Sequence, residues 1–238
     1  MGVKMGSRRS AKLPPKSDTE STGSEIGKVR IIGGSLRGRT LEFPTAPQMR
    51  PMKDRVREAL FNLIGPSIKN TRVIDLFAGT GALGFEAISR GAVHATFIER
   101  HVPTARLLRD NARRLQLETS TDVINSDTFV WWKRRPVLAN EPTVVFCSPP
   151  YELYQSRTAD LMQLLAGLMH QLMPGSRLAV EFDERFSAAQ LPNSDDWDVR
   201  GYAGIFLAIY VCTATPAPRD AAEDVSDAGE DVSDADGT

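Results

Sequence analysis

Residues 75–84 have the sequence DLFAGTGALG, and this stretch decides the fold class. It begins at the end of a short apolar run, 72–76, and continues into a helix-like run, 81–90. Gly79, Gly81 and Gly84 have the G-x-G-x-x-G spacing of a loop that joins a strand to a helix beside a bound nucleotide. The glycine spacing by itself fits a dinucleotide-binding domain.

Asp75 changes this interpretation, because it precedes the first glycine by four positions. A carboxylate at the mouth of the loop repels a pyrophosphate, whereas it attracts the ammonium and sulfonium groups of S-adenosylmethionine (SAM). The glycines then allow the backbone to approach such a ligand closely. The stretch therefore predicts SAM as the cofactor rather than a nicotinamide dinucleotide. The plainer alternative is that Asp75 is a carboxylate in a surface turn.

The predicted cofactor site also takes residues from the ends of the following strands. Glu99 ends the second predicted strand and can bond ribose hydroxyls, although it can equally be an acid at the start of a helix. Asp127 follows the third strand and can bond an adenine amino group, with Phe129 as an apolar wall. The predicted cofactor-binding residues are Asp75, Phe77, Ala78, Gly79, Thr80, Gly81, Ala82, Glu99, Arg100, Ser126, Asp127, Thr128 and Ser148.

A second motif, Ser148-Pro149-Pro150-Tyr151, directly follows the apolar run 143–147. Ligands of open α/β sheets bind at the carboxyl ends of the strands, so this motif is expected beside the glycine loop. The prolines fix the backbone, and hydrogen bonds to Ser148 and to the Pro149 carbonyl can orient an NH2 group toward a sulfonium methyl. Catalysis then rests on positioning, and all four residues are predicted to be catalytic. The alternative is a rigid loop in which Tyr151 only packs.

The rest of the chain predicts an α/β fold, because short apolar runs alternate with helical ones. A hairpin-like unit at 29–43 and a helix at 53–64 precede the alternation, and two final strands separated by two residues predict an antiparallel edge. The predicted fold is the Rossmann-like, seven-stranded sheet of SAM-dependent methyltransferases, with helices on both faces and a small N-terminal extension. The predicted strands are 72–76, 94–98, 121–124, 143–147, 177–182, 197–202 and 205–212, and the helices after residue 80 are 81–90, 102–115, 126–133, 156–172 and 184–190.

Composition divides the chain into a folded body and two polar tails. Residues 1–28 are rich in Ser, Lys, Gly and Pro, and the sequence EDVSDA occurs twice, at 223–228 and 230–235, so both ends are predicted to be disordered. The predicted units are a tail at 1–28, a basic RNA-binding hairpin and helix extension at 29–66, a methyltransferase domain at 67–215 and an acidic tail at 216–238.

The cysteine and histidine content excludes several classes of protein. Cys147 and Cys212 cannot form a disulfide framework and favour a reduced, cytoplasmic protein. No apolar run has the length of a membrane span. His94, His101 and His170 lack the spacing of metal ligands, so no metal site is predicted.

Basic residues are concentrated in the N-terminal extension. Seven bases and only two acids, Glu42 and Asp54, lie between residues 29 and 57. Arginines spaced by glycines can follow a phosphate backbone and stack on unpaired bases, which favours RNA as the partner. The alternative, a solvated helix face, applies most to Lys53 and Arg57. The predicted RNA-binding residues are Arg30, Arg37, Arg39, Arg50, Lys53 and Arg55.

From 29 to about 212 the chain resembles the bacterial small-subunit rRNA guanine-N2 methyltransferases of the RsmD type. The resemblance rests on RIIGG at 30–34, RGR at 37–39, Arg50-Pro51, DRVREALF at 54–61, the glycine loop at 75–84 and the Pro-Pro-Tyr motif. It implies methylation of a guanine N2 in 16S rRNA, of the guanine-966 type, on a partly assembled ribosomal particle. We expect the protein to be a monomer.

Three positions and both tails depart from the pattern of this family. Ser35 replaces a common aromatic residue, Met52 a small hydroxyl residue, and Ser148 the more usual Asp or Asn. Ser-Pro-Pro-Tyr also occurs in cytosine-N4 methyltransferases. Alternatives therefore remain: DNA adenine N6 or cytosine N4, a protein glutamine, or a non-catalytic RNA-binding assembly factor.

Overall fold

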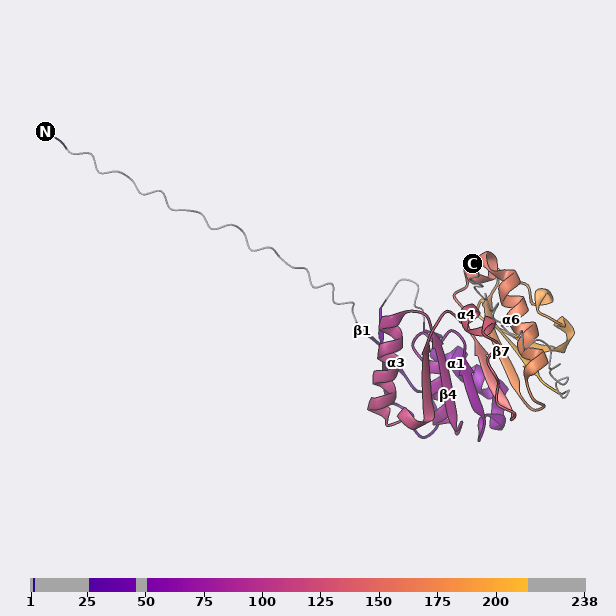
Figure 1. Ribbon diagram of the computed structural model, residues 1–238, viewed down its shortest axis with the longest axis horizontal. Coiled ribbons are helices and arrows are strands. Elements are labelled where there is room, and N and C mark those ends of the chain that lie inside the picture. Colours follow the sequence, from indigo (N-terminus) through magenta and orange to yellow (C-terminus); the bar gives the residue numbers. More distant parts are fainter. Residues whose placement is uncertain (1, 3–25, 46–50, 214–238) are drawn as a thin grey trace, which may run out of the picture.

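The computed structural model describes residue 2 and residues 26–45 and 51–213. Within them, continuous apolar runs form strands that are buried on both faces, and all five residues of β6 (Thr143–Cys147) are buried. Successive residues of this strand point to opposite faces of the sheet, so that Val144 belongs to one hydrophobic core and Val145 to the other. Each core is covered by helices, so the sheet is the middle layer of three (Figure 1).

The sheet has seven strands in the order β5-β4-β3-β6-β7-β9-β8. The first five are parallel, whereas β9 runs antiparallel to both β7 and β8. Besides β6, the strands are β3 (Arg72–Asp75), β4 (His94–Glu99), β5 (Thr121–Asn125), β7 (Arg177–Asp183), β8 (Trp197–Tyr202) and β9 (Ile205–Val211). The predicted seven-stranded sheet with an antiparallel edge is confirmed.

The helices divide between the two faces of the sheet. The core on one face includes residues of α1, α2 and α3, and the core on the other includes residues of α4, α5 and α6. The helices are α1 (Asp54–Ile64), α2 (Ala82–Ser89), α3 (Val102–Leu115), α4 (Thr128–Lys133), α5 (Leu153–Ser156) and α6 (Thr158–Gln171). In Figure 1, α3 and α6 lie toward opposite sides of the view.

The N-terminal extension is a hairpin of β1 (Ile26–Arg30) and β2 (Thr40–Pro44) followed by α1. The side chain of Asn111 on α3 accepts a hydrogen bond from the Glu42 N–H at 3.0 Å and donates one to the Glu42 carbonyl at 2.7 Å. The Asn111 side chain pairs with the main chain of β2 as a neighbouring strand would, and it attaches the hairpin to α3.

Two boundaries differ from the sequence prediction. Because β1 begins at Ile26, the predicted end of the N-terminal tail at residue 28 is wrong by three residues. The predicted helix at 184–190 is also wrong, since only the 3-10 turn η3 (Ala188–Gln190) forms there. The Asp183 side chain accepts hydrogen bonds from the Arg185 N–H and Nε, which closes a turn instead of a helix. Residues 3–25 and 214–238, with most of both predicted tails, lie outside the described residues.

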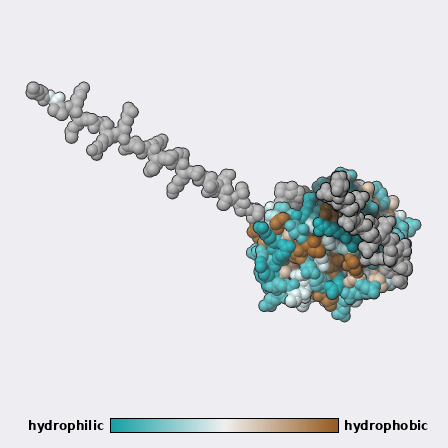
Figure 2. Space-filling view, viewed as in Figure 1, coloured by the Kyte–Doolittle hydropathy of each residue, from teal (hydrophilic) through white to brown (hydrophobic). Residues whose placement is uncertain are grey.

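The surface in Figure 2 is largely hydrophilic over α3, with smaller hydrophobic areas beside it. On α3 itself, Arg106, Arg109 and Arg113 are exposed. In the parts of the chain that the structure describes, no helix is long and apolar enough to cross a membrane.

Candidate functional site

The glycine loop and the Ser-Pro-Pro-Tyr loop leave the sheet side by side. Asp75, the last residue of β3, is paired with Phe146 of β6, and the Leu76 N–H donates to the Phe146 carbonyl at 3.0 Å. Because β3 and β6 are parallel neighbours, the two loops begin at the same edge of the sheet. The two predicted motifs, about seventy residues apart in the sequence, therefore form one site.

Asp75 is almost completely buried, so the alternative of a surface-turn carboxylate is wrong. Its Oδ2 accepts a hydrogen bond from the Gly84 N–H at 3.3 Å, and its Oδ1 has no partner among the described residues. Burial raises the pKa of Asp75 to about 7, the Gly84 N–H opposes this rise, and the negative Glu99 adds to it. A buried acceptor without a partner fits a cationic ligand group, as the ammonium of SAM supplies.

The three glycines of the motif have three different roles. Gly79 has φ +49°, and a Cβ there would meet only the Phe77 carbonyl oxygen at 3.9 Å, so this part of the loop is open. Gly81 has φ +75° and precedes α2, and its N–H donates to the Ala78 carbonyl at 2.7 Å, which closes a tight turn. A Cβ on Gly84 would lie 2.3 Å from the Phe97 ring, so this glycine lets α2 pack on the sheet.

Glu99 connects the glycine loop to the end of β4. Its Oε2 accepts a hydrogen bond from the Gly79 N–H at 2.9 Å, and its Oε1 accepts one from the His101 N–H at 2.7 Å. The second contact is the helix-start role that the sequence left as an alternative. Each carboxylate oxygen keeps a further lone pair, so Glu99 remains able to accept from ribose hydroxyls.

Asp127 acts first as the cap of α4. Its Oδ1 accepts hydrogen bonds from the N–H groups of Phe129 and Val130 at 2.9 and 3.2 Å. Its Oδ2 lies 3.8 Å from Nη1 of Arg157, whose guanidinium group is 3.9 Å from the centre of the Phe129 ring. The predicted adenine-binding side chain is thus held by the residues that border it.

The remaining predicted cofactor residues lie on the same strand-end loops and differ in exposure. The hydroxyl of Thr128 donates to the Leu76 carbonyl, which links the loop after β5 to that after β3. Four of them are buried, namely Ala78, Thr80, Ala82 and Thr128. Phe77 and Ser126 are half-buried, and Arg100 is exposed.

The Ser-Pro-Pro-Tyr loop contains a side-chain network that includes one residue absent from the sequence prediction. The Ser148 hydroxyl donates to Oε2 of Glu181, and the Tyr151 hydroxyl donates to Oε1 of the same carboxylate at 2.9 Å. Glu181 is buried on β7, next to β6, and burial raises its pKa while the two hydroxyls oppose that rise. An acid inside the apolar run 177–182 is the only sequence signal for this residue.

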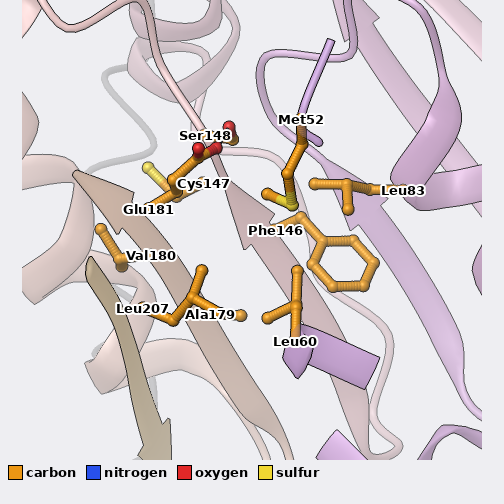
Figure 3. A pocket seen from close by; sticks show the side chains of 10 residues that line it. All are labelled: Met52, Leu60, Leu83, Phe146, Cys147, Ser148, Ala179, Val180, Glu181 and Leu207. Carbon is orange, nitrogen blue, oxygen red and sulfur yellow. Dashed lines mark hydrogen bonds between the residues drawn. The ribbon is translucent and has the colours of Figure 1, made fainter. Parts of the chain in front are cut away.

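A small, tightly packed and largely apolar pocket lies next to this network. Figure 3 shows the oxygens of Ser148 and Glu181 together at one end of it, with apolar side chains around the rest. The Met52 side chain reaches into the same pocket from the segment before α1. Two of the three positions that depart from the family pattern, Met52 and Ser148, therefore line one pocket.

The predicted RNA-binding residues lie on the hairpin, its loop and the start of α1. Arg37, Lys53 and Arg55 are exposed, and among the described residues none of the three forms an ion pair. Arg50 lies outside the described residues, so its predicted role is untested.

Arg30 and Arg39 are exposed but already have protein partners. Arg30 pairs with Asp54 at 2.6 Å, and Arg39 donates to the Arg114 main-chain oxygen at 3.2 Å. Such surface contacts are weak, so both side chains can exchange them for phosphate oxygens.

Arg57 belongs neither to an RNA surface nor to a solvated helix face, and both sequence interpretations are wrong. Its side chain is fully buried and donates to the main-chain oxygens of Arg30 and Met52 and to Asp54. Its Nε lies 3.8 Å from the buried Glu86 of α2. Arg57 therefore connects the hairpin and α1 to α2.

No group of His, Cys, Asp and Glu side chains in 26–45 and 51–213 has the arrangement of a metal site. Cys147 and Cys212 are both free and buried.

Comparison with known proteins gives a family and relatives for this arrangement. The model of a family described as "Conserved hypothetical protein 95" matches residues 29–211. Ribosomal RNA small subunit methyltransferase D of Escherichia coli K12 is 42% identical over 128 residues, which are 54% of this chain and 63% of that protein. The alignments thus span about 63% of the length of the first curated relatives.

Solved structures share the fold over a longer range. A putative methyltransferase from E. coli has a TM-score of 0.61 and 31% identity and covers 79% of this chain and 100% of its own. An RNA methyltransferase from Salinibacter ruber, in complex with S-adenosyl-L-homocysteine, has a TM-score of 0.51 and 18% identity, covering 73% of this chain and 100% of its own. The fold is therefore the α/β Rossmann-like methyltransferase fold.

Proposed function

The chain belongs to the conserved hypothetical protein 95 family, the RsmD family, and from this premise we propose that it transfers a methyl group from SAM to an exocyclic amino group of small-subunit rRNA. The more specific acceptor that we propose is the N2 of a guanine in 16S rRNA. We expect the enzyme to act in the cytoplasm, as a monomer, on a partly assembled ribosomal particle.

The observation that carries the proposal is the adjacency of the two loops at the ends of β3 and β6. Asp75 begins one loop and Ser148 the other, and their strands are directly hydrogen-bonded. A ligand held by the first loop thus lies next to the side chains of the second. Proximity of this kind is the main requirement for methyl transfer between two bound molecules.

The residues of the glycine loop suit SAM in charge and in shape. Asp75 provides a negative charge for its ammonium group, Glu99 provides acceptors for its ribose, and the open backbone at Gly79 admits close approach. Asp127 and Phe129 provide a polar and an apolar border for its adenine. When bound, SAM supplies an electrophilic methyl group on a sulfonium centre.

The second loop suits an amino group as the acceptor. Ser148 and the Pro149 carbonyl supply hydrogen-bond acceptors for two N–H donors, and the half-buried Tyr151 ring supplies a stacking surface. The amino nitrogen forms a bond to the methyl carbon, the carbon–sulfur bond breaks, and its electron pair stays on sulfur. The nitrogen then loses one proton to solvent. A base within structured RNA must leave its stack to reach this position.

Relatives and surface charge support rRNA as the substrate. The curated relatives are named rRNA small-subunit methyltransferases, and Arg37, Lys53 and Arg55 are exposed basic side chains of the extension. Positive side chains on a hairpin and a helix start can follow a phosphate backbone.

The test is methyl transfer from labelled SAM to small ribosomal subunits, and in parallel to naked rRNA, from a strain that lacks its own RsmD-type enzyme. Nucleoside analysis then identifies the product. We expect N2-methylguanosine, and more of it from the particle than from naked rRNA. N4-methylcytidine or N6-methyladenosine would retain the reaction but overturn the guanine assignment.

A non-catalytic assembly factor is the second candidate function, and Ser148 favours it because a neutral serine replaces the usual Asp or Asn. Tight SAM binding without any label in RNA or DNA would support this candidate and overturn the enzyme.

A further inference from the structure

Glu181 brings a carboxylate to the position where this chain lacks the usual acidic or amide side chain. Residue 148 is a serine, and its hydroxyl is bonded to Glu181 on the neighbouring strand β7, 33 residues later. Val180, the preceding residue, is paired with Cys147, so the β6–β7 register places the two side chains together. The hydrogen-bonded side chains of Ser148 and Glu181 together thus take the place of the single longer Asp or Asn side chain.

The hydrogen-bond direction within this pair determines what Ser148 offers to a ligand. A serine hydroxyl has one proton to donate and two lone pairs to accept with. An ionised carboxylate only accepts, so the Ser148 proton must point to Glu181. The lone pairs of Ser148 Oγ are then left for another donor. The same reasoning applies to the Tyr151 hydroxyl, which donates to Oε1 of Glu181 at 2.9 Å.

We propose that Glu181 is a positioning residue that keeps the Ser148 hydroxyl as a hydrogen-bond acceptor for the amino group that receives the methyl. The proposal rests on the proposed function, because it concerns the same acceptor. It identifies the feature of the substrate that is recognised as an N–H donor. The hydroxyl groups of Ser148 and Tyr151 both donate their protons to Glu181, so neither hydroxyl can donate to a carbonyl oxygen or a ring nitrogen of the base.

The surroundings of Glu181 are unusual for a purely structural carboxylate. It is 7% exposed, and among the described residues no Lys or Arg forms an ion pair with it. Arg185, the nearby base, is instead bonded to Asp183. Burial of a carboxylate that has only two hydroxyl donors costs folding free energy, and a role in positioning the acceptor explains why such a group is present here. Both of its donors are predicted catalytic residues.

The lining of the pocket in Figure 3 joins this network to the apolar core. Ser148 and Glu181 supply oxygens to the lining, and Met52 and Leu83 are among its apolar side chains. The buried Glu181 carboxylate therefore lies among apolar groups, where a hydrogen bond is stronger than in water.

The proposal predicts a non-additive set of variants in the methyl-transfer assay. Glu181→Gln keeps the size of the side chain but adds an amide donor, so the direction of the Ser148 hydroxyl is no longer fixed. We expect kcat to fall about tenfold or more, equivalent to ~1.4 kcal/mol, with the Kd for SAM unchanged. Ser148→Asn supplies a carbonyl acceptor that does not depend on Glu181. The double variant S148N/E181Q is expected to stay within about twofold of S148N, which is a coupling between neighbours.

The control is Glu184→Gln, an exposed acid just after β7, which should leave kcat and the Kd for SAM unchanged. Thermal unfolding and SAM titration show whether each variant is folded. If S148N fails to fold, S148A with E181Q gives the same cycle, since the double variant should then be no slower than S148A.

Three results overturn the proposal while leaving the proposed function intact. Additive losses in the cycle, or a loss in E181Q that appears only as lower stability, would make Glu181 structural while the proposed function stands. An unchanged kcat in folded E181Q also overturns it. Absence of methyl transfer by the wild-type protein would instead overturn the proposed function, and this proposal with it.

Discussion

Asp75 and Gly84, the first and last residues of the glycine motif, are joined by a hydrogen bond from the Gly84 N–H to Oδ2 of Asp75 at 3.3 Å. The bond holds a buried carboxylate under the first turn of α2, while its other oxygen has no partner among the described residues. The two ends of the motif thus fix a charge that the protein alone does not compensate. The first two predictions follow from this charge.

The unliganded protein is expected to lose stability as pH rises toward 7. Burial raises the pKa of Asp75 to about 7 in the folded state, above the ordinary aspartate value of 3.8. Between these values the folded state binds more protons than the unfolded state, so the free energy of unfolding falls with rising pH. Asp75→Asn removes this dependence. Urea unfolding at pH 4.5 and pH 8 should show a gain in stability for Asp75→Asn at pH 8 and little difference at pH 4.5.

Binding of SAM is expected to release a proton from Asp75 below about pH 7. A cationic group beside the carboxylate favours its ionised form and lowers its pKa, so affinity rises as Asp75 ionises. Calorimetry in buffers of different ionisation enthalpy measures this release, and Asp75→Asn should abolish it and weaken binding. Asp195→Asn, at an exposed acid, is the matched control. Equal proton release in Asp75→Asn would contradict the assignment.

Tyr151→Ala is expected to remove most methyl transfer while the Kd for SAM stays nearly unchanged. Loss of stacking on a base costs ~1–3 kcal/mol, or about five- to 160-fold in kcat/KM. Tyr151→Phe keeps the ring and loses only the hydroxyl bond to Glu181, so its loss should be about tenfold or less. Steady-state kinetics and SAM titration provide both values. Equal loss of activity and cofactor affinity in Tyr151→Ala would exclude the stacking role.

Arg57→Met is expected to destabilise the fold, whereas Arg55→Met is not. Removal of the Arg57 charge leaves the buried Glu86 with fewer partners and two main-chain oxygens without donors, at about 3–5 kcal/mol. Arg55 is exposed, and its loss should change stability by about 0.5 kcal/mol or less. Chemical denaturation compares the two. A similar stability for both variants would show that the buried network contributes little.

Arg37→Ala is expected to weaken RNA binding and its dependence on salt. Loss of one phosphate contact lowers the slope of log K against log salt by about 0.7 to 0.9. Filter binding with the rRNA at several salt concentrations measures the slope. Arg200→Ala, on the opposite edge strand β8, is the control and should leave the slope unchanged. Equal slopes for wild type and Arg37→Ala would place the RNA elsewhere.

Much of the fold was predictable because its signals are local. Apolar runs such as 143–147 indicate a strand that is buried on both faces. The spacing of Gly79, Gly81 and Gly84 indicates a tight loop between a strand and the helix that follows it. The exception at 184–190 also has a local cause, since the Asp183 side chain closed a turn that helix propensity did not indicate. The cofactor-binding and catalytic residues were predicted from the same kind of local signal, and their roles stay predictions.

The order of strands and helices, the glycine loop with its acid, and the Ser-Pro-Pro-Tyr motif could all be read from the amino-acid sequence. The contact between Glu181 and Ser148, the place of Met52 in the same pocket and the burial of Arg57 required the folded structure. These facts depend on which strands and helices become neighbours, because a side chain's partner is set by sheet order and register rather than by distance along the chain. Glu181 is an ordinary acid in a strand until the pairing of β6 with β7 places it against Ser148.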